Sequence, residues 1–280
     1  MFALQSVEEI RQALSPVRKS NKTIGLVPTM GALHAGHETL IQTARLEADI
    51  VVVTIFVNPL QFAPNEDYGK YPRALPNDME ICSRCGADFV FAPTVQEMYP
   101  LPQLSLVEVT RVSEHLCGAF RPGHFRGVAT VVLKLTNIIQ PDRAWFGEKD
   151  MQQLAVIRRM VVDLNLPIEI IGVPTVREPD GLALSSRNQY LNPSERKAAP
   201  VLYRSLQHAA KLIHSGERNT SKIREAAIAI LNEEPLARLE YLEVVDAEMQ
   251  PVAEVSGRVR IAGAVRIGNT RLIDNVLATD

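Results

Sequence analysis

The chain has 280 residues, of which 46% are apolar, so it can form one large domain or two ordinary ones with a full core. Its net charge of −2 and pI of about 6.3 lack the basic excess of nucleic-acid-binding proteins, so we expect no nucleic-acid partner. No apolar run reaches the length of a membrane span and the N-terminus has no signal-peptide core. We therefore expect a cytoplasmic protein with no membrane partner.

The first 175 residues alternate between two hydrophobic periods. Short aliphatic or β-branched runs predict strands at residues 22–28, 49–57, 87–92, 144–146 and 168–173. Helical spacing predicts helices at residues 38–47, 78–85, 127–139 and 152–164. The run DIVVVTIFV at 49–57 is typical of a strand buried on both faces. We therefore predict an α/β fold, with a Rossmann-like parallel sheet covered by helices.

The pattern changes after about Arg187. Residues 192–232 predict a long helical segment with Asn192 or Ser194 as its N-cap, and residues 239–247 and 258–268 predict strands. In the last strand, arginines at 258, 260 and 266 alternate with apolar residues, which indicates a half-solvated strand; the balanced charge disfavours a nucleic-acid surface. We expect a Rossmann-like domain at 1–175 and a smaller α+β C-terminal domain at 176–280.

The three cysteines pose a separate question. Cys82 and Cys85 form C-S-R-C, and Cys117 is the third. An odd number without a secretory signal argues against a disulfide framework, and zinc would need a second ligand pair. Because residues three apart share a helix face, we interpret the pair as ordinary helix cysteines, with a functional C-x-x-C as the alternative.

The stretch PTMGALHAGH at 28–37 lies where a predicted strand passes into a helix. Gly31 and Gly36 have no Cβ, so a ligand can approach their backbone closely. A helix N-terminus offers N–H groups and roughly half a positive charge to a phosphate. His34 and His37, three residues apart, can both face that group and stabilise its negative charge. The alternative is a helix-start turn with two structurally satisfied histidines.

Other polar residues follow predicted strands. Gln61, in FVNPLQF at 56–62, comes after the buried strand, at the sheet edge where open α/β sheets bind ligands. Asp150, in FGEKD at 146–150, can cap the following helix. Lys149, beside it, would by itself be interpreted as a solvated lysine.

The stretch at 28–37 resembles the HIGH signature of the nucleotidyltransferase superfamily, in which such histidines bind ATP phosphates. Together with FVNPLQF, YPR at 71–73, RPGHFRGV at 121–128, FGEKD and DGLALSSRN at 180–188, the chain resembles the pantoate–β-alanine ligase (pantothenate synthetase) family almost throughout. That resemblance implies two steps. Pantoate and ATP form pantoyl adenylate and pyrophosphate, and the amine of β-alanine then releases AMP and gives pantothenate.

The resemblance also implies site residues. The ATP-binding set is Met30, Gly31, Ala32, Leu33, His34, Ala35, Gly36, His37, Gly147, Glu148, Lys149, Asp150, Val176, Leu184, Ser185, Ser186 and Arg187. The catalytic set within it is His34, His37, Lys149 and Arg187, with His37 as the charge stabiliser. Gln61 and Gln153 are implied to bind pantoate.

Further expectations follow from the same resemblance. ATP phosphates would carry Mg²⁺, with Asp78 near the metal. Ser185, Ser186 and Arg187 would grip the leaving pyrophosphate. The resemblance also implies a homodimer. Independently of it, we expect the C-terminal domain to act as a lid hinged at 175–187. Ala35 and Leu184 stand where the family often has an acidic residue and a methionine, and we expect only altered packing against adenine.

Two other functions compete with this interpretation. One is a nucleotidyltransferase that leaves the nucleotide on its product; the paired glutamines and the SSR stretch disfavour it. The other is a non-catalytic nucleotide-binding or redox protein built around Cys82 and Cys85. It predicts that loss of both thiols abolishes function, while loss of His37 does not.

Overall fold

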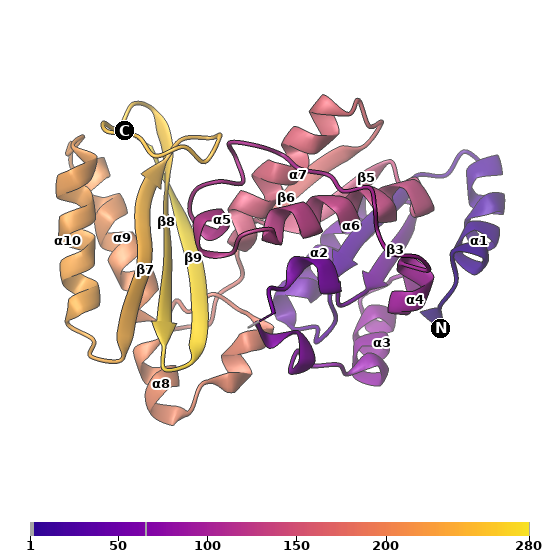
Figure 1. Cartoon of the computed structure of the whole chain (residues 1–280), viewed down its shortest axis with the longest axis horizontal. Coiled ribbons are helices and arrows are strands. Elements are labelled where there is room, and N and C mark those ends of the chain that lie inside the picture. Colours follow the sequence, from indigo (N-terminus) through magenta and orange to yellow (C-terminus); the bar gives the residue numbers. More distant parts are fainter. Residues whose placement is uncertain (1–2, 65, 280) are drawn as a thin grey trace. The chain divides into compact units, whose positions relative to one another are not determined.

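The structure, a computed structural model, describes residues 3–64 and 66–279 and divides into two compact units (Figure 1). The first unit comprises Met1–Val109, Arg121–Glu148 and Val156–Pro174, and the second comprises Thr110–Phe120, Lys149–Ala155 and Thr175–Asp280. The sequence pattern predicted one boundary after residue 175. By their contacts, two short segments before that point, at 110–120 and 149–155, belong with the second unit.

The first unit is built on a six-stranded sheet of order β1-β4-β3-β2-β5-β6, in which every recorded pairing is parallel. Its strands are β1 (Ala3–Leu4), β2 (Ile24–Thr29), β3 (Ile50–Ile55), β4 (Phe89–Phe91), β5 (Arg143–Gly147) and β6 (Glu169–Val173). The helices are α1 (Val7–Lys19), α2 (Ala35–Glu47), α3 (Leu75–Arg84), α4 (Val95–Met98), α6 (His124–Ile139) and α7 (Met151–Asp163), whose first turn belongs to the second unit. Strands and helices alternate along the chain, and the strands form one parallel sheet, which confirms the predicted Rossmann-like α/β fold.

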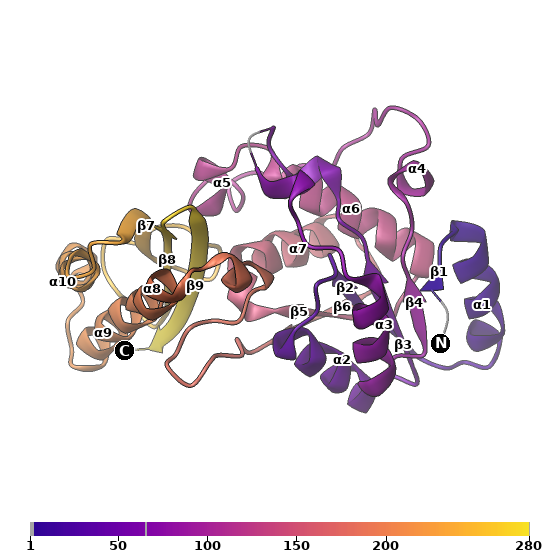
Figure 2. The same ribbon diagram turned by 90° about the horizontal axis from the view of Figure 1, so that it is seen from below.

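The sheet has helices on both faces. Figure 2 shows α2 and α3 on one side of the strands and α6 on the other. On the α2 side, Ile41 of α2 and Cys82 of α3 pack with Val51 of β3 and Trp145 of β5 in one core cluster. Each of these side chains is fully buried. Full burial of a large aliphatic side chain contributes roughly 1.5–3 kcal/mol, so this layer holds the strand ends firmly in place.

The order of the strands creates a switch point beside β2. The chain leaves β2 for β3 on one side, whereas β5 pairs with β2 on the other. The pairing of β2 with β5 ends at Leu26, while its pairing with β3 continues to Thr29. Pro28 lies in this last stretch and has no backbone N–H to donate. The strands therefore diverge at their carboxyl ends, the position at which such sheets bind ligands.

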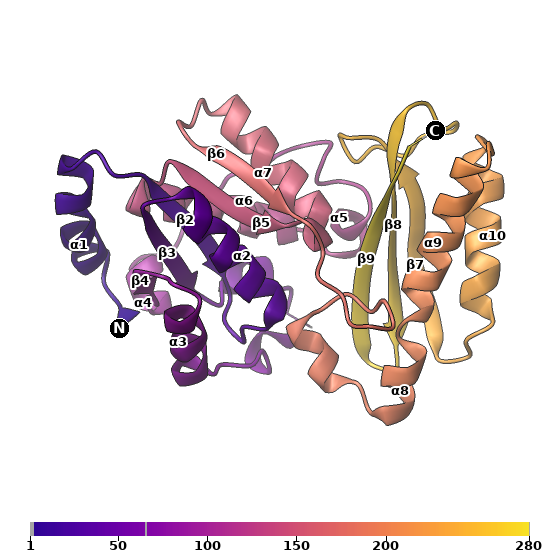
Figure 3. The same cartoon turned by 180° about the vertical axis from the view of Figure 1, so that it is seen from behind.

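The second unit is a three-stranded antiparallel sheet with helices (Figure 3). Its strands are β7 (Ala237–Val245), β8 (Arg258–Ile267) and β9 (Thr270–Thr279), with β8 in the centre. Its helices are α5 (Cys117–Phe120), α8 (Pro193–Ala198), α9 (Val201–His214) and α10 (Thr220–Asn232). The core cluster of this unit joins Leu206 of α9, Ile223 of α10 and Ile261 of β8. The predicted smaller α+β C-terminal part is thus present.

Three details of the C-terminal prediction were wrong. The expected single helix at 192–232 is three helices, because Pro200 and the Ser215–Gly216 turn interrupt it. Asn192, one of the two predicted N-caps, caps the first of these helices. The third strand, β9, was missed. The predicted half-solvated strand is the central, mostly buried β8, in which Arg260 is only 9% exposed and donates to Asn275 Oδ1.

Candidate functional site

The turn after β2 is held by the buried carboxylate of Asp78, in α3. Asp78 Oδ2 accepts a hydrogen bond from the N–H of Ala32 (3.0 Å) and Oδ1 accepts one from the N–H of Leu33 (2.8 Å). Gly31 and Ala32 have positive φ angles of 80° and 51°, and a Cβ on Gly31 would lie 2.9 Å from that carboxylate. Burial raises the pKa of Asp78, and the two N–H groups oppose the rise. Asp78 therefore organises the turn; its expected role near a metal stays a prediction.

His34 and His37 lie together at the start of α2. Their ring centroids are 4.1 Å apart, and His34 is the N-cap residue. His34 Nδ1 accepts from the N–H of Gly36 (3.1 Å), and His37 Nδ1 accepts from the N–H of His34 (3.3 Å). A Cβ on Gly36 would lie 3.0 Å from the His34 ring, so glycine leaves room for this cap. Because both Nδ1 atoms accept, each neutral ring carries its proton on Nε2, the tautomer that can donate to a phosphate.

Gln61 lies against the same turn. It is buried in the short 3-10 helix η1 (Pro59–Gln61) that follows β3, and its Nε2 donates to Met30 Sδ (2.9 Å). Asn58 donates to Gln61 Oε1 (3.2 Å) and to the carbonyl of Gly127 (3.1 Å). The structure thus brings the predicted pantoate amide and the predicted ATP turn together within the first unit.

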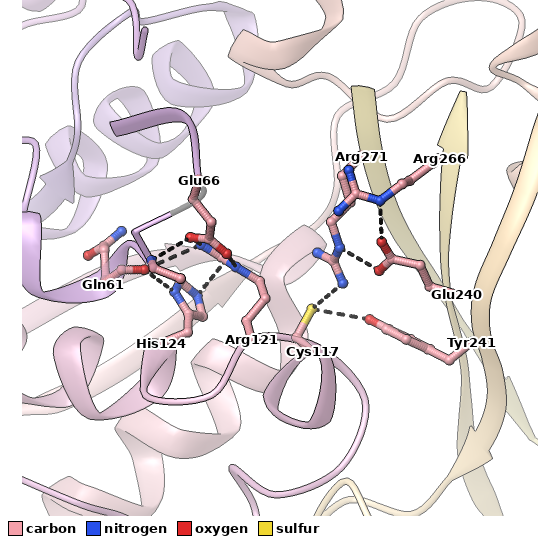
Figure 4. Close-up of polar contacts among 10 residues, drawn as sticks. Gln61, Glu66, Cys117, Arg121, His124, Glu240, Tyr241, Arg266 and Arg271 are labelled. Carbon is pink, nitrogen blue, oxygen red and sulfur yellow. Dashed lines mark hydrogen bonds and ion pairs between the residues drawn. The ribbon is translucent and has the colours of Figure 1, made fainter. Parts of the chain in front are cut away.

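A polar network lies behind η1 (Figure 4). Gln61 O accepts from His124 Nδ1 (2.8 Å) and from Arg121 Nη2 (3.3 Å). Arg121 forms a two-point ion pair with Glu66, at 2.6 and 2.7 Å. Burial disfavours the charge on Glu66, but the bonds and charge of Arg121 outweigh burial and hold its pKa below the usual value. This network was missed, although the motif RPGHFRGV that supplies it was visible in the sequence.

At the end of β5, Gly147 faces open space, since a Cβ there would meet nothing within 4 Å. The next residues enter the second unit through a 3-10 turn, η3 (Glu148–Asp150), which leads into α7. Lys149 O accepts from Asn275 Nδ2 (3.1 Å) in β9, and Lys149 Nζ lies 3.8 Å from Asp150. Asn275 thus anchors the backbone that carries the predicted phosphate-binding lysine.

The predicted SSR stretch follows a small hairpin. Leu184 N–H donates to Val176 O (3.0 Å), so these two predicted ATP-binding residues lie opposite each other. Ser185 caps the 3-10 helix η4 (Ser186–Tyr190), because its Oγ accepts from the N–H of Arg187 (3.3 Å). Inside the hairpin, Arg177 pairs with the buried carboxylate of Asp274 in β9 at 2.6 Å. This pair ties the hairpin to the sheet of the second unit.

The neighbouring glutamines of α7 differ in their surroundings. Gln152 is buried, accepts from the N–H of Cys117 (3.0 Å) and donates to the carbonyls of Val112 (2.9 Å) and His115 (2.6 Å). Gln153, the predicted pantoate ligand, is half-buried. Gln152 is therefore a structural residue that fixes the 112–117 segment, and the substrate role of Gln153 stays a prediction.

A second cluster in Figure 4 holds the same segment to the antiparallel sheet. Cys117 Sγ lies 3.2 Å from Tyr241 Oη and accepts from Arg271 Nη2 (3.4 Å). Glu240 pairs with Arg271 at 2.7 Å and with Arg266 at 2.9 Å. Burial raises the pKa of Tyr241 well above its usual value. The cluster joins α5 to β7 and β9.

The C-x-x-C pair is confined to the interior. Cys82 and Cys85 are both free thiols and buried in the α2–α3 layer. Burial raises the pKa of Cys82 to about 12. Within residues 3–64 and 66–279, no group of three or more His, Cys, Asp or Glu side chains could hold a metal ion. The interpretation as ordinary helix cysteines is therefore the one that the structure supports.

Comparison with known proteins decides the family. A sequence profile described as "Pantoate-beta-alanine ligase" matches residues 3–277. The chain belongs to the pantoate–β-alanine ligase family. It is 52% identical to the pantothenate synthetase of Moorella thermoacetica, over 99% of this chain and 98% of that protein.

Solved structures of this ligase family agree with the fold. A pantothenate synthetase from Thermus thermophilus is 47% identical, with a TM-score of 0.94 over 99% of each chain. A pantoate–β-alanine ligase from Francisella tularensis, solved with a β,γ-ATP compound and β-alanine, is 36% identical with a TM-score of 0.81, over 99% of this chain and 97% of that one. The family predicted from the motifs is confirmed, and with it the predicted ligase class and fold.

No helix formed by the described residues is long and apolar enough to span a membrane.

Proposed function

We propose that this protein joins pantoate to β-alanine at the expense of ATP, through pantoyl adenylate, and releases pyrophosphate and AMP. One observation carries the proposal: Gln61 Nε2 donates to Met30 Sδ at the foot of the histidine turn. A hydroxy acid bound by Gln61 would then lie beside the residues suited to nucleotide phosphates. Adjacent sites for an acid and a nucleotide are what acyl-adenylate formation requires.

In the first step the carboxylate of pantoate attacks the α-phosphate of ATP. Both reactants are negative, so the site must supply charge and hydrogen-bond donors. His34 and His37 would donate through Nε2 to the phosphates, at the positive end of the α2 dipole. Lys149, Ser185, Ser186 and Arg187 would stabilise the pyrophosphate that leaves. Met30–His37, Gly147–Asp150, Val176 and Leu184 complete the proposed ATP-binding set.

In the second step the uncharged amine of β-alanine attacks the acyl carbon, and AMP departs. Gln61 and Gln153 would hold the hydroxyl and acyl groups of pantoate during both steps, because an amide can donate and accept at once. Acyl adenylates hydrolyse readily, so water must be excluded. We propose that residues 176–280 act as the lid for this purpose and that the protein is cytoplasmic. We further propose that it works as a homodimer, which the family resemblance implies.

Mg²⁺ is part of the proposal as the partner of the ATP phosphates. Because the described residues offer no three-ligand cluster, a site made of protein groups alone does not fit. A Mg²⁺ ion held mainly by phosphates and water does fit, and Asp78 is the acidic group that contacts the turn directly. When bound, the metal would neutralise phosphate charge.

The direct test measures AMP and pyrophosphate release with ATP, Mg²⁺ and pantoate, with and without β-alanine. Full turnover to AMP that needs both acids, together with pantoate-dependent exchange of pyrophosphate into ATP, is the expected result. AMP release that does not depend on pantoate would overturn the substrate assignment. A nucleotide retained on the product would instead indicate a nucleotidyltransferase.

A further inference from the structure

The backbone carbonyl of Gln61 links the short helix η1 to a distant part of the chain. It accepts from two side chains that lie 60 or more residues away in the chain, His124 Nδ1 at 2.8 Å and Arg121 Nη2 at 3.3 Å. His124 is the first residue of α6, the helix against which η1 packs, and Arg121 lies three residues before it. The orientation of Gln61 therefore depends on the N-terminal end of α6 as well as on its own loop.

The partners of His124 define its protonation. Gln61 O can only accept, so His124 Nδ1 must carry a proton. Arg121 Nη1 lies 3.0 Å from His124 Nε2, and a guanidinium can only donate. Nε2 must therefore accept, which leaves His124 as the neutral Nδ1–H tautomer. This is the opposite tautomer to the one inferred for His34 and His37.

Arg121 is itself held in place. Its Nε and Nη2 bond the two carboxylate oxygens of Glu66 at 2.6 and 2.7 Å, and only 14% of the Arg121 side chain and 22% of the Glu66 side chain are exposed. Glu66 Oε2 also accepts from the N–H of Ala63 (3.2 Å), in the loop that follows η1. A two-point arginine–carboxylate pair fixes the plane of the guanidinium. The pair therefore aims Nη1 at His124 and Nη2 at Gln61.

We propose that His124 and Arg121 are positioning residues for the pantoate site. They act through the carbonyl of Gln61, hold η1 on α6, and keep the Gln61 amide in the orientation that binds the hydroxy acid. Arg121 imposes the Nδ1–H tautomer of His124, and only this neutral tautomer can donate to the carbonyl of Gln61. This inference rests on the proposed role of Gln61 as a pantoate ligand.

Steady-state kinetics of three variants test the proposal. His124→Phe keeps a ring but removes the donor, and we expect kcat/KM for pantoate to fall roughly tenfold, the order expected for one lost hydrogen bond in a substrate-positioning contact. The KM for ATP should stay within about twofold, because the histidine turn is untouched. His124→Asn, whose amide can donate to Gln61 O and accept from Arg121, should recover most of the loss. His214→Gln, on an exposed position of α9, is the matched control and should behave as wild type.

A double variant separates the two proposals. If Gln61→Ala leaves kinetics with pantoate unchanged, the pantoate-ligand role of Gln61 is wrong. If Gln61→Ala is impaired and adding His124→Phe causes no further loss, the positioning role is supported. A full, additive loss in the double variant would overturn it, because the two residues would then act independently.

The tautomer provides a readout that does not depend on activity. In ¹⁵N-histidine-labelled protein, the ring resonances of His124, assigned by their loss in His124→Asn, should show a protonated Nδ1 and an unprotonated Nε2. Replacing Arg121 by Gln should shift this pattern, and replacing it by Lys should retain it in part. A dominant Nε2–H form in the wild-type protein would contradict the proposal even if His124→Phe failed to fold.

Discussion

The carboxylate of Asp78 binds the N–H of Ala32 in a turn where Ala32 itself has a φ of 51°. Left-handed backbone costs a non-glycine residue roughly 1–2 kcal/mol, so the surroundings must hold it there. Asp78 is only 1% exposed and has a second bond to the next N–H, of Leu33. The helix α3 thus acts as the clamp of the turn that carries the proposed ATP-binding histidines.

Replacing Asp78 by Ala should therefore destabilise the protein and weaken ATP binding. Each buried N–H left unpaired should cost about 1–3 kcal/mol, and the KM for ATP should rise. Asp163→Asn, which removes one partner of an exposed ion pair with Arg159, is the control and should cost about 0–1 kcal/mol. Urea unfolding measures the loss of stability, and steady-state kinetics measure the KM for ATP. Equal stability of Asp78→Ala and Asp163→Asn would show that Asp78 does not hold the turn.

Ala32→Gly should have an unusually small effect on stability. Glycine stabilises the folded state by removing the strain of the positive φ, but it destabilises the protein by increasing the conformational entropy of the unfolded chain. Each contribution is about 1 kcal/mol, so the two nearly cancel. At the exposed position 229 inside α10, Ala→Gly should cost about 1 kcal/mol without compensation. Urea unfolding of both variants provides the comparison; an equal loss at the two positions would show that the turn is unstrained.

The local parts of the fold could be predicted because they depend on neighbours in sequence. Two examples are strand β3 and the turn at residues 28–37 that joins a strand to a helix. A continuous apolar run indicates β3, and the hydrophobic period together with the glycines indicates the turn. The boundaries differ by a few residues, as at α2, which begins at Ala35 because His34 caps it.

The remaining features depend on distant partners. Asp78 lies 46 residues from Ala32, and Asn275 lies 126 residues from Lys149, so no local pattern shows that they meet. For the same reason, the burial of Arg260 could not be predicted from the alternation of β8, because its partner Asn275 lies on another strand. The family motifs predict which residues bind the substrates, and the tertiary contacts show what holds several of these residues in place.

Gly127→Ala should displace the loop that carries Gln61. A Cβ at position 127 would lie 2.2 Å from the carbonyl oxygen of Leu60, a backbone atom that cannot move without moving η1. We expect a loss of about 1–3 kcal/mol in stability, as for other overpacked sites, and a larger fall in kcat/KM for pantoate than for ATP. Gly69→Ala is the control, because a Cβ there meets nothing within 4 Å. Wild-type pantoate kinetics in Gly127→Ala would mean that η1 tolerates the shift.

The thiols of Cys82 and Cys85 should be dispensable for catalysis. Both are buried in the α2–α3 layer, and burial raises the pKa of each thiol, so little reactive thiolate is present near neutral pH. The double variant Cys82→Ala/Cys85→Ala should form pantothenate with nearly unchanged KM values, while His37→Ala should lose most activity. A dead double variant that remains folded by circular dichroism would favour the redox alternative.

Cys82 should also make stability fall at alkaline pH. Its pKa is raised from 9.0 to about 12 in the folded protein, so the unfolded chain loses this proton first. The stabilising contribution is therefore complete below about pH 9 and is lost as the pH rises toward 12, at up to about 1.4 kcal/mol per pH unit. Urea unfolding between these limits should show the stability advantage of the wild type over Cys82→Ala shrinking as the pH rises. A constant difference would mean that the thiol titrates alike in both states and that its burial does not suppress ionisation.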